Sequence, residues 1–299
     1  MPGTTPHTAW AVAGLLLNAF VWGLSWWPFK QLEALGLHPL WATAVVYGLS
    51  FLAIALWVRH RHIPTGWRQH TGLWWLLIAS GLTNVGFNWA VTVGDVVRVV
   101  LLFYLMPAWS VLVAWWLLGD KPSTGALLRL LLALSGLVIV LHTPDSPWPV
   151  PESLADGLAL LGGLSFAITN ALLFKLKDTP EASRMLAMFG GGTFMAALTA
   201  LLGTGSAVVV QSVLWESGWI APVLALTLAF LAGNIALQYG AARLPAHTTA
   251  LVMLSEVVFA SVSSVILGAS TWDARTLLGG ALILLAAVLS VVMPGQSTH

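Results

Sequence analysis

The chain has 299 residues, of which 58% are hydrophobic and only 8% are charged, whereas a soluble domain carries about 25% charged residues. This composition excludes an ordinary water-soluble globular protein. The net charge of +1 comes from scattered side chains without a basic run, so nothing indicates a nucleic-acid-binding surface. The chain has no cysteine, which excludes disulfides, thiol catalysis, iron–sulfur clusters and cysteine-ligated zinc.

Ten segments are long and apolar enough to cross a membrane, which takes about 20 apolar residues for about 30 Å of hydrocarbon. They lie at roughly 9–29, 40–58, 71–92, 97–118, 125–142, 155–176, 184–204, 219–240, 246–268 and 275–292. Short breaks of turn residues separate them, such as Gly-Asp-Lys-Pro at 119–122, and leave no room for a soluble domain. We therefore predict an all-α integral membrane protein with ten transmembrane helices.

The distribution of Lys and Arg predicts the orientation of these spans. If the N-terminus is cytoplasmic, the outer loops and helix ends hold three basic residues, Lys30, Arg98 and Arg275. The inner ones then hold nine: Arg59, Arg61, Arg68, Lys121, Arg129, Lys175, Lys177, Arg184 and Arg243. Because basic residues accumulate on the cytoplasmic side, we expect both termini in the cytoplasm.

The sequence resembles itself at a spacing of about 150 residues. Asn-Val-Gly-Phe-Asn-Trp at 84–89 matches Asn-Ile-Ala-Leu-Gln-Tyr at 234–239. Two halves of five spans explain this match, an N-terminal repeat over 1–147 and a C-terminal repeat over 148–299 that together form one functional unit. Since five is odd, the second half enters the membrane in the opposite sense. Inverted repeats of this kind are typical of secondary transporters, which hold their substrate near mid-membrane between the halves.

Both repeats place a pair of amides on one helix face. Asn84 and Asn88 lie four residues apart in the third span, as do Asn234 and Gln238 in the eighth. Small residues on another face, such as Gly86, let neighbouring helices approach closely. The amides either bind neighbouring helices, at about 0.6 to 2 kcal/mol per contact, or line a central cavity. Their presence in both halves favours a shared central surface.

Glu256 is the one clear ionisable residue far from any span end. A charge at this depth costs several kcal/mol unless it meets water or a partner. We therefore expect Glu256 to face the interior, where it carries a proton or contacts a substrate ammonium. The alternative is a neutral carboxylic acid that fixes the ninth helix to a neighbour.

The repeat places Pro107 at the position equivalent to Glu256. A proline inside a helix removes the bond to the carbonyl four residues back, here that of Phe103, and bends the helix. With Tyr104 on the same face, the fourth span could offer a carbonyl and a phenol to a ligand, or the kink could only improve packing. Gly190, Gly191 and Gly192 mark either a hinge or very close packing.

The candidate residues fall into two groups. The candidate substrate-binding residues are Trp22, Ser25, Asn84, Asn88, Tyr104, Asn170, Asn234, Gln238 and Glu256. The candidate hinge or kink residues are Pro107, Gly190, Gly191 and Gly192. The spans hold no closely spaced His pair, and the chain has no nucleotide-binding Gly-rich loop, no Gly-x-Ser-x-Gly turn and no paired acidic motif. We therefore expect neither enzyme activity nor a metal or cofactor.

Several motifs resemble a known transporter family. The first span reads Phe-Val-Trp-Gly-Leu-Ser at 20–25 and ends at Lys30, and a Leu-Gly step closes a span in each half, at 118–119 and 267–268. These features resemble the drug/metabolite transporter superfamily, in particular its EamA-type branch. The stretch 94–109 is similar to aromatic amino acid exporters of that branch. One departure is Ala269, because Asp120 follows the equivalent Leu-Gly step in the first half.

The resemblance implies a bacterial inner-membrane protein that exports aromatic and other neutral amino acids. Transport would proceed by alternating access through a central cavity between the repeats. It implies a small-molecule substrate and a lipid bilayer as partners, no nucleic acid and no obligate protein partner, and it leaves coupling to protons open. The alternative is efflux of drugs or other metabolites by a carrier of the same superfamily. An intramembrane enzyme and a passive channel are the remaining alternatives.

Overall fold

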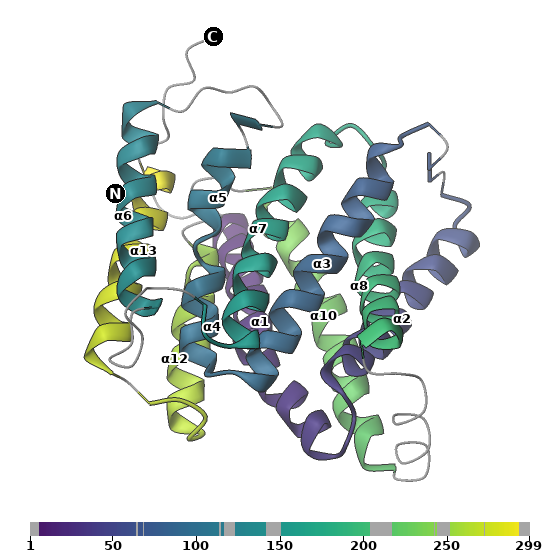
Figure 1. The fold of residues 1–299 in the computed structure, drawn as a ribbon. Coiled ribbons are helices and arrows are strands. Elements are labelled where there is room, and N and C mark those ends of the chain that lie inside the picture. Colours follow the sequence, from purple (N-terminus) through teal and green to yellow (C-terminus); the bar gives the residue numbers. More distant parts are fainter. Residues whose placement is uncertain are drawn as a thin grey trace.

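The protein is an all-helical bundle in the computed structural model, which describes residues 6–63, 65–67, 69–113, 115–116, 123–141, 151–203, 217–241, 243, 252–271 and 273–292. In chain order its elements are α1 (Pro6–Ala34), α2 (Pro39–His60), α3 (Gly72–Val93), α4 (Val96–Phe103), α5 (Met106–Val113), α6 (Thr124–Leu141), α7 (Leu154–Lys175), α8 (Glu181–Gly203), the short 3-10 turn η2 (Ser217–Trp219), α10 (Ile220–Ala241), α12 (Ser255–Ile266) and α13 (Ala274–Val292). Successive spans run in alternating directions, and α4 and α5 follow one another as a single broken span (Figure 1).

The helix lengths agree with the predicted spans. Seven segments of the described chain are long and apolar enough to cross a membrane, and one of them combines α4 and α5 into Val96–Val113. Three shorter apolar helices lie at Thr124–Val140, Ser255–Ile266 and Ala274–Leu289. Together they occupy the ten predicted positions, which confirms the prediction of an all-α membrane fold.

The surface of the bundle is more apolar than that of a soluble protein, although its interior is also mainly apolar. Asn18, Asn88 and Ser264 are buried, whereas Leu202, Leu228 and other large apolar side chains are exposed. Lipid tails are as apolar as leucine, so exposed leucines cost nothing in a bilayer, while polar groups find partners only inside the bundle.

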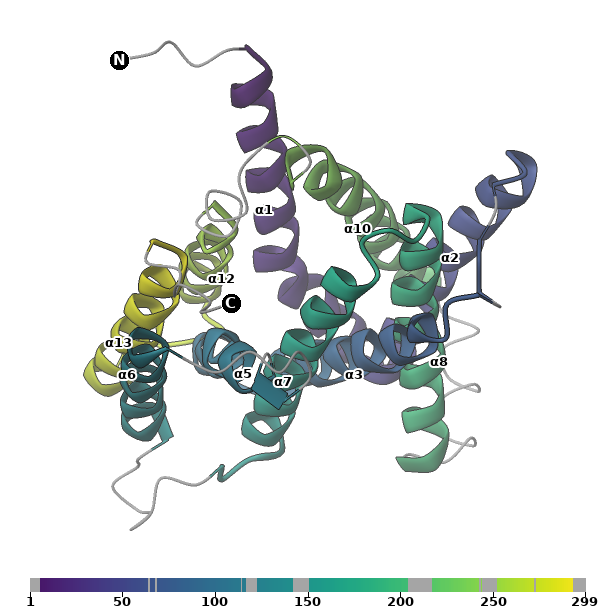
Figure 2. The same cartoon turned by 90° about the horizontal axis from the view of Figure 1, so that it is seen from above.

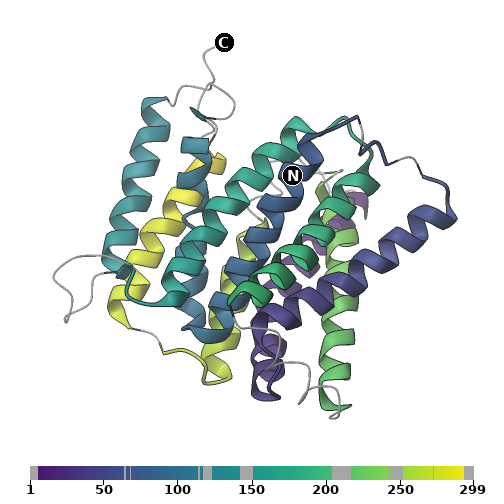
Figure 3. The same ribbon diagram turned by 45° about the vertical axis from the view of Figure 1, so that its right-hand side comes forward.

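The helices pack in pairs that recur in the two halves of the chain. α1 packs against α10 and α12, and α7 packs against α3 and against α4 and α5. α2 pairs with α8, and α6 pairs with α13. The α6–α13 pair lies at one edge of the bundle and α2 and α8 at the opposite edge (Figures 2 and 3). This arrangement of pairs stays the same when the first five spans are exchanged with the last five.

Glycines allow the closest contacts between helices. A Cβ atom added to Gly136 in α6 would lie 2.6 Å from the carbonyl oxygen of Gly279 in α13, and one added to Gly279 would lie 2.7 Å from that of Gly136. A Cβ atom on Gly86 in α3 would lie 2.6 Å from the Leu158 carbonyl oxygen in α7. No other residue type fits these positions unless the backbones move apart, as expected for small residues at membrane helix interfaces.

The fourth and ninth spans are both interrupted at equivalent positions. α4 ends at Phe103 and α5 begins at Met106, so that Tyr104 and Leu105 form a turn. Leu254, about 150 residues later, is likewise a turn residue immediately before α12 begins. The sequence predicts a distortion only in the fourth span, next to Pro107. The second break has no proline. Glu256 occupies the position equivalent to Pro107.

Candidate functional site

The two helix breaks bring Tyr104 and Glu256 into direct contact. The phenol of Tyr104 donates a hydrogen bond to Glu256 Oε2 at 2.9 Å and a longer one to the Met253 carbonyl oxygen at 3.4 Å. Glu256 is only 8% exposed and Tyr104 only 6%. Glu256 is therefore buried inside the bundle as expected, and the phenol, which the sequence predicted to face a ligand, binds this carboxylate.

The start of α12 is a favourable place for the Glu256 carboxylate. Glu256 lies in the first turn of this helix, where the helix dipole stabilises negative charge. Within the described chain, no Lys, Arg or His forms an ion pair with it. The dipole and the Tyr104 hydroxyl are thus the favourable interactions that the structure supplies.

Two asparagines contact methionines beside these helix breaks. Asn18 in α1 donates from Nδ2 to Met253 Sδ at 3.6 Å, and Asn170 in α7 donates from Nδ2 to Met106 Sδ at 3.7 Å. Asn18 is buried, and its Oδ1 has no hydrogen-bond partner among the described residues. Asn18 is not among the site residues predicted from the sequence. An asparagine within the first membrane span could have indicated it.

A series of aromatic rings extends from Tyr104 across the bundle. Trp22 in α1 stacks on Phe230 in α10 with centroids 4.8 Å apart and meets Phe87 in α3 edge-on at 6.1 Å. Phe87 contacts Phe103 at 4.8 Å, and Phe103 contacts Tyr104 at 6.1 Å. Trp22 is partly exposed and packs against the two largest hydrophobic clusters. The sequence indicated Trp22 and Tyr104, but not the phenylalanines between them.

The amides of the third span bond to neighbouring groups. The Tyr47 hydroxyl donates to Asn84 Oδ1 at 2.6 Å, and Asn84 Nδ2 donates to the Ser80 carbonyl oxygen at 2.8 Å. Asn88 Nδ2 donates to Thr43 Oγ1 at 3.3 Å. Asn84 and Asn88 thus join α3 to α2, which corresponds to the interhelical alternative, while Asn88 Oδ1 has no partner among the described residues.

The remaining candidates do not join the Tyr104–Glu256 pair in the described contacts. Ser25 donates to the Trp22 carbonyl oxygen of its own helix at 2.8 Å. Asn170 is exposed and Asn234 partly buried. The side chain of Gln238 lies outside the described residues, as does that of Pro107. The part of these residues in a substrate site stays a prediction.

The glycine triplet lies within an unbroken helix. α8 runs from Glu181 to Gly203 without interruption. Gly191 faces the Leu77 carbonyl oxygen of α3, and Gly192 faces the ring of Tyr47 in α2, both too closely for any side chain. These glycines therefore serve close packing in this structure, and their hinge role stays a prediction.

The carbonyl of Phe103 is covered by a neighbouring helix. A Cβ atom on Gly163 in α7 would lie 2.6 Å from the Phe103 oxygen. α7 thus approaches the break between α4 and α5 at backbone distance. This contact limits the access of a ligand to the Phe103 carbonyl, which the sequence predicted to be free.

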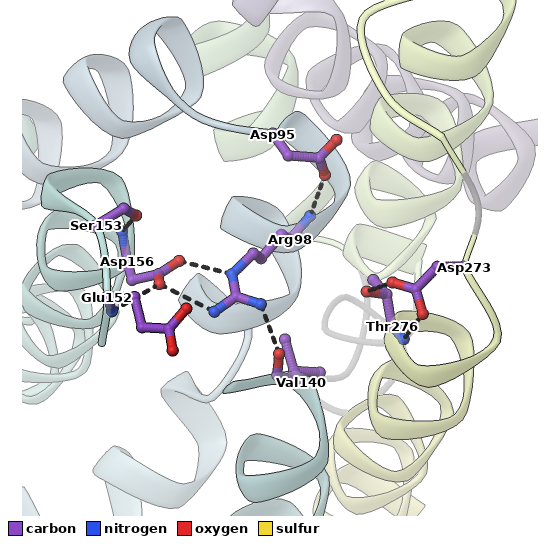
Figure 4. Close-up of polar contacts among 8 residues, drawn as sticks. All are labelled: Asp95, Arg98, Val140, Glu152, Ser153, Asp156, Asp273 and Thr276. Atoms are coloured by element: carbon purple, nitrogen blue, oxygen red, sulfur yellow. Dashed lines mark hydrogen bonds and ion pairs between the residues drawn. The ribbon is translucent and has the colours of Figure 1, made fainter. Parts of the chain in front are cut away.

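A bidentate ion pair links three helices at one end of the bundle. Arg98 in α4 donates from Nε to Asp156 Oδ1 at 2.8 Å and from Nη2 to Asp156 Oδ2 at 2.9 Å (Figure 4). Its Nη1 donates to the Val140 carbonyl oxygen in α6 at 2.6 Å. Asp156 also accepts from the Glu152 backbone at 3.2 Å. The sequence predicts Arg98 on the outer side of the membrane but does not indicate Asp156 as its partner.

Two further polar contacts join the halves at the same end. Trp26 Nε1 in α1 donates to Ser263 Oγ in α12 at 3.0 Å. The Val97 backbone N–H in α4 is 3.4 Å from Ser270 Oγ, beyond α12. Together with the Arg98–Asp156 pair, these contacts connect residues 1–147 to residues 148–299 at the end where α3 meets α4 and α12 meets α13.

Asp273 caps the last helix near this end. It accepts from Thr276 Oγ1 at 2.5 Å and from the Thr276 backbone at 3.2 Å (Figure 4). The Thr276 hydrogen bond holds the pKa of the Asp273 carboxyl below its usual range. Asp273 is therefore an exposed capping carboxylate with no contact to the Tyr104–Glu256 pair in the described structure.

Comparison with known proteins assigns the first half of the chain to a protein family. Residues 9–142 match the model of the EamA-like transporter family. No curated protein matches the chain. A solved structure described as "Crystal structure of protein" aligns over 97% of this chain and 98% of its own, with a TM-score of 0.57 and 18% identity, which shows a shared fold alone. The resemblance inferred from the first span and the Leu-Gly step is thus confirmed at the level of the family domain: residues 9–142 form an EamA-like transporter domain.

Proposed function

We propose that the protein is a secondary transporter that exports aromatic and other neutral amino acids by alternating access. The Tyr104–Glu256 contact is the observation that carries this proposal, because it places a buried acid and a phenol between the breaks of the fourth and ninth spans. Interrupted helices near mid-membrane commonly form the substrate sites of secondary transporters. The EamA-like domain in residues 9–142 supports the same class of activity.

The proposed architecture consists of two inverted repeats, residues 1–147 and 148–299. The contacts of α2 with α8 and of α6 with α13 support this division, since a two-fold relation brings equivalent elements together. The packing of α1 on α10 matches that of α3 on α7, as a two-fold exchange requires. Both termini are proposed to be cytoplasmic in a bacterial inner membrane, because of the positive-inside distribution.

The aromatic series suits the apolar part of such a substrate. Trp22 lies between the two main hydrophobic clusters and keeps part of its ring exposed. An aromatic ring of a ligand gains stacking energy beside it. We expect the substrate side chain at Trp22 and its polar groups toward Tyr104 and Glu256.

The contacts at the Arg98 end suit one stage of an alternating-access cycle. Arg98–Asp156, Trp26–Ser263 and Val97–Ser270 hold the proposed repeats together at this end. Opening this end requires all three contacts to separate. By the positive-inside rule it is the outer end, so the arrangement corresponds to an outwardly closed state.

Efflux of organic cations is the second candidate function. A buried acid beside aromatic rings also suits a lipophilic cation, which combines ion pairing with cation–π attraction. Competition of such cations against amino acid flux separates the two candidates.

The decisive experiment uses purified protein in liposomes. Labelled phenylalanine, tryptophan and alanine are measured with and without a proton gradient, and empty vesicles serve as the control. Saturable flux and counterflow support a carrier, whereas unsaturable flux without counterflow indicates a channel. Absence of flux above empty vesicles for all three amino acids overturns amino acid export.

A further inference from the structure

The surroundings of Glu256 contain more hydrogen-bond acceptors than donors. The carboxylate and the Met253 carbonyl are acceptors, and the Tyr104 hydroxyl, which contacts both, already donates to Glu256. An ionised carboxylate accepts several hydrogen bonds and donates none. The groups gathered here therefore call for a ligand that donates.

Met253 contacts both Asn18 and Tyr104. Asn18 contacts its sulfur at 3.6 Å, while Tyr104 lies 3.4 Å from its carbonyl oxygen. A thioether is only a weak acceptor. Asn18 Nδ2 therefore has a weak partner, and Asn18 Oδ1 has no hydrogen-bond partner among the described residues. Asn18 is 1% exposed, and buried amides of native proteins usually find better partners than these.

The α1–α12 contact holds Asn18 and Glu256 on adjoining helices. Gly23 in α1 faces the backbone of Glu256 so closely that an added Cβ atom would lie 2.9 Å from the Glu256 carbonyl oxygen. α1 is thus fixed against the first turn of α12, and Asn18 lies little more than one turn before Gly23. Asn18 Oδ1 itself faces α10, where a Cβ atom added to Gly233 would lie 3.2 Å from it, so Asn18 meets α12 through the Met253 sulfur.

The charge of the site is also uncompensated within the described chain. Arg98 pairs with Asp156 at the end of the bundle and not with Glu256. A carboxylate inside a membrane bundle requires a proton, a partner or a cationic ligand. A primary ammonium supplies both the charge and three donors.

We propose that Glu256 and the Met253 carbonyl form an ammonium-binding subsite, so that ligands of this protein must carry a protonated amine. This inference rests on the proposed transport function and specifies which end of the substrate is recognised. Tyr104 is a positioning residue that holds the carboxylate through its hydroxyl. The ligand carboxylate contributes less, because an acceptor-rich site repels it.

Three ligands of one shape test the subsite. Phenylalanine carries both charged groups, 2-phenylethylamine only the ammonium and 3-phenylpropionate only the carboxylate. Binding to purified full-length protein is measured directly through the quenching of tryptophan fluorescence and, independently, through the ligand-induced shift in Tm. We expect phenylalanine and 2-phenylethylamine to bind at least tenfold more tightly than 3-phenylpropionate.

Variants assign the preference to named groups. Glu256→Gln should weaken 2-phenylethylamine binding at least tenfold and should not weaken 3-phenylpropionate binding. Glu256→Asp retains the charge and should keep the preference for the amine. This result would show that the weaker binding in Glu256→Gln comes from the lost charge and not from a folding defect. Asp273→Asn removes an exposed carboxylate elsewhere and should change nothing.

The outcomes separate this inference from the proposed function. Equal binding of amine and acid, or an unchanged preference in Glu256→Gln, overturns the ammonium subsite even if liposomes transport phenylalanine. Binding of the amine without any amino acid flux supports the subsite and overturns amino acid export instead.

Discussion

Arg98 and Asp156 face one another with two parallel hydrogen bonds, at 2.8 and 2.9 Å, from helices that belong to different halves of the chain. The arginine side chain is 21% exposed and the aspartate 3%. Bidentate guanidinium–carboxylate pairs are both strong and geometrically specific. Since α4 and α7 meet here, the pair opposes separation of the proposed repeats at this end.

Removal of the ion pair should open this end more often. The chain has no cysteine, so a single Ser264→Cys variant reports on access to a buried position of α12 at the same end. In Arg98→Ala, we expect a membrane-impermeant maleimide to label this cysteine several-fold faster. The measurement is the labelling rate in intact vesicles.

A charge exchange serves as the control for this labelling. Removing one side of this partly buried pair leaves the other charge unpaired, which can destabilise the whole fold. The double variant Arg98→Asp, Asp156→Arg restores opposite charges and should return labelling toward the parent rate. Equal labelling in parent and Arg98→Ala would contradict a closing role of the pair.

The fold was largely predictable because the bilayer imposes a length and polarity on every span. The positions of ten apolar segments follow directly from hydropathy, and Glu256 was expected inside because exposure to lipid is costly. The Arg98–Asp156 pair was not predictable, since its residues lie in different spans and meet only through helix packing. The interruption at Leu254 was not predictable either, because no proline marks it.

The sequence predicted several residues of the candidate site but not the contacts between them. Tyr104 was expected to offer its phenol to a ligand, but the tertiary structure directs it to Glu256. Asn84 and Asn88 were equally compatible with cavity lining and interhelical bonding, because sequence spacing defines a helix face without naming its neighbour. Only the packing of α2 against α3 reveals Tyr47 and Thr43 as their partners.

The Asn84 contacts predict a stability effect without an affinity effect. Asn84→Ala removes the acceptor of the Tyr47 hydroxyl, and a typical hydrogen bond contributes about 0.5–1.5 kcal/mol. We expect a lower Tm in detergent and an unchanged KM for phenylalanine. Tyr47→Phe, which removes the same bond from the other side, should lower the Tm similarly. A raised KM in Asn84→Ala with an unchanged Tm would instead support substrate binding by this amide.

The glycine contact between α6 and α13 predicts a steric requirement. Gly136→Ala places a Cβ atom 2.6 Å from the Gly279 carbonyl oxygen, and overpacking of this kind costs typically about 1–3 kcal/mol. We expect a clear loss of Tm in thermal unfolding. Gly157→Ala is the matched control, because a Cβ atom there meets nothing within 4 Å. Alanine is the better helix former by up to about 1 kcal/mol, so this control should be neutral or stabilising, and equal losses in both variants would contradict the argument.

The carboxyl group of Glu256 predicts how transport responds to pH. A proton and a substrate ammonium compete for the same oxygens, so in the parent protein acidification should weaken apparent substrate affinity once the group becomes protonated. Tyr104 is the titratable group that contacts Glu256 in the described structure. In Glu256→Gln nothing titrates at this position, and the profile of KM against pH should flatten while expression and Tm change less. The measurement is phenylalanine flux in liposomes across pH 5–8, with Asp273→Asn as the control that retains the parent profile. A variant Glu256→Gln with an unaltered profile would leave this acid a purely structural role.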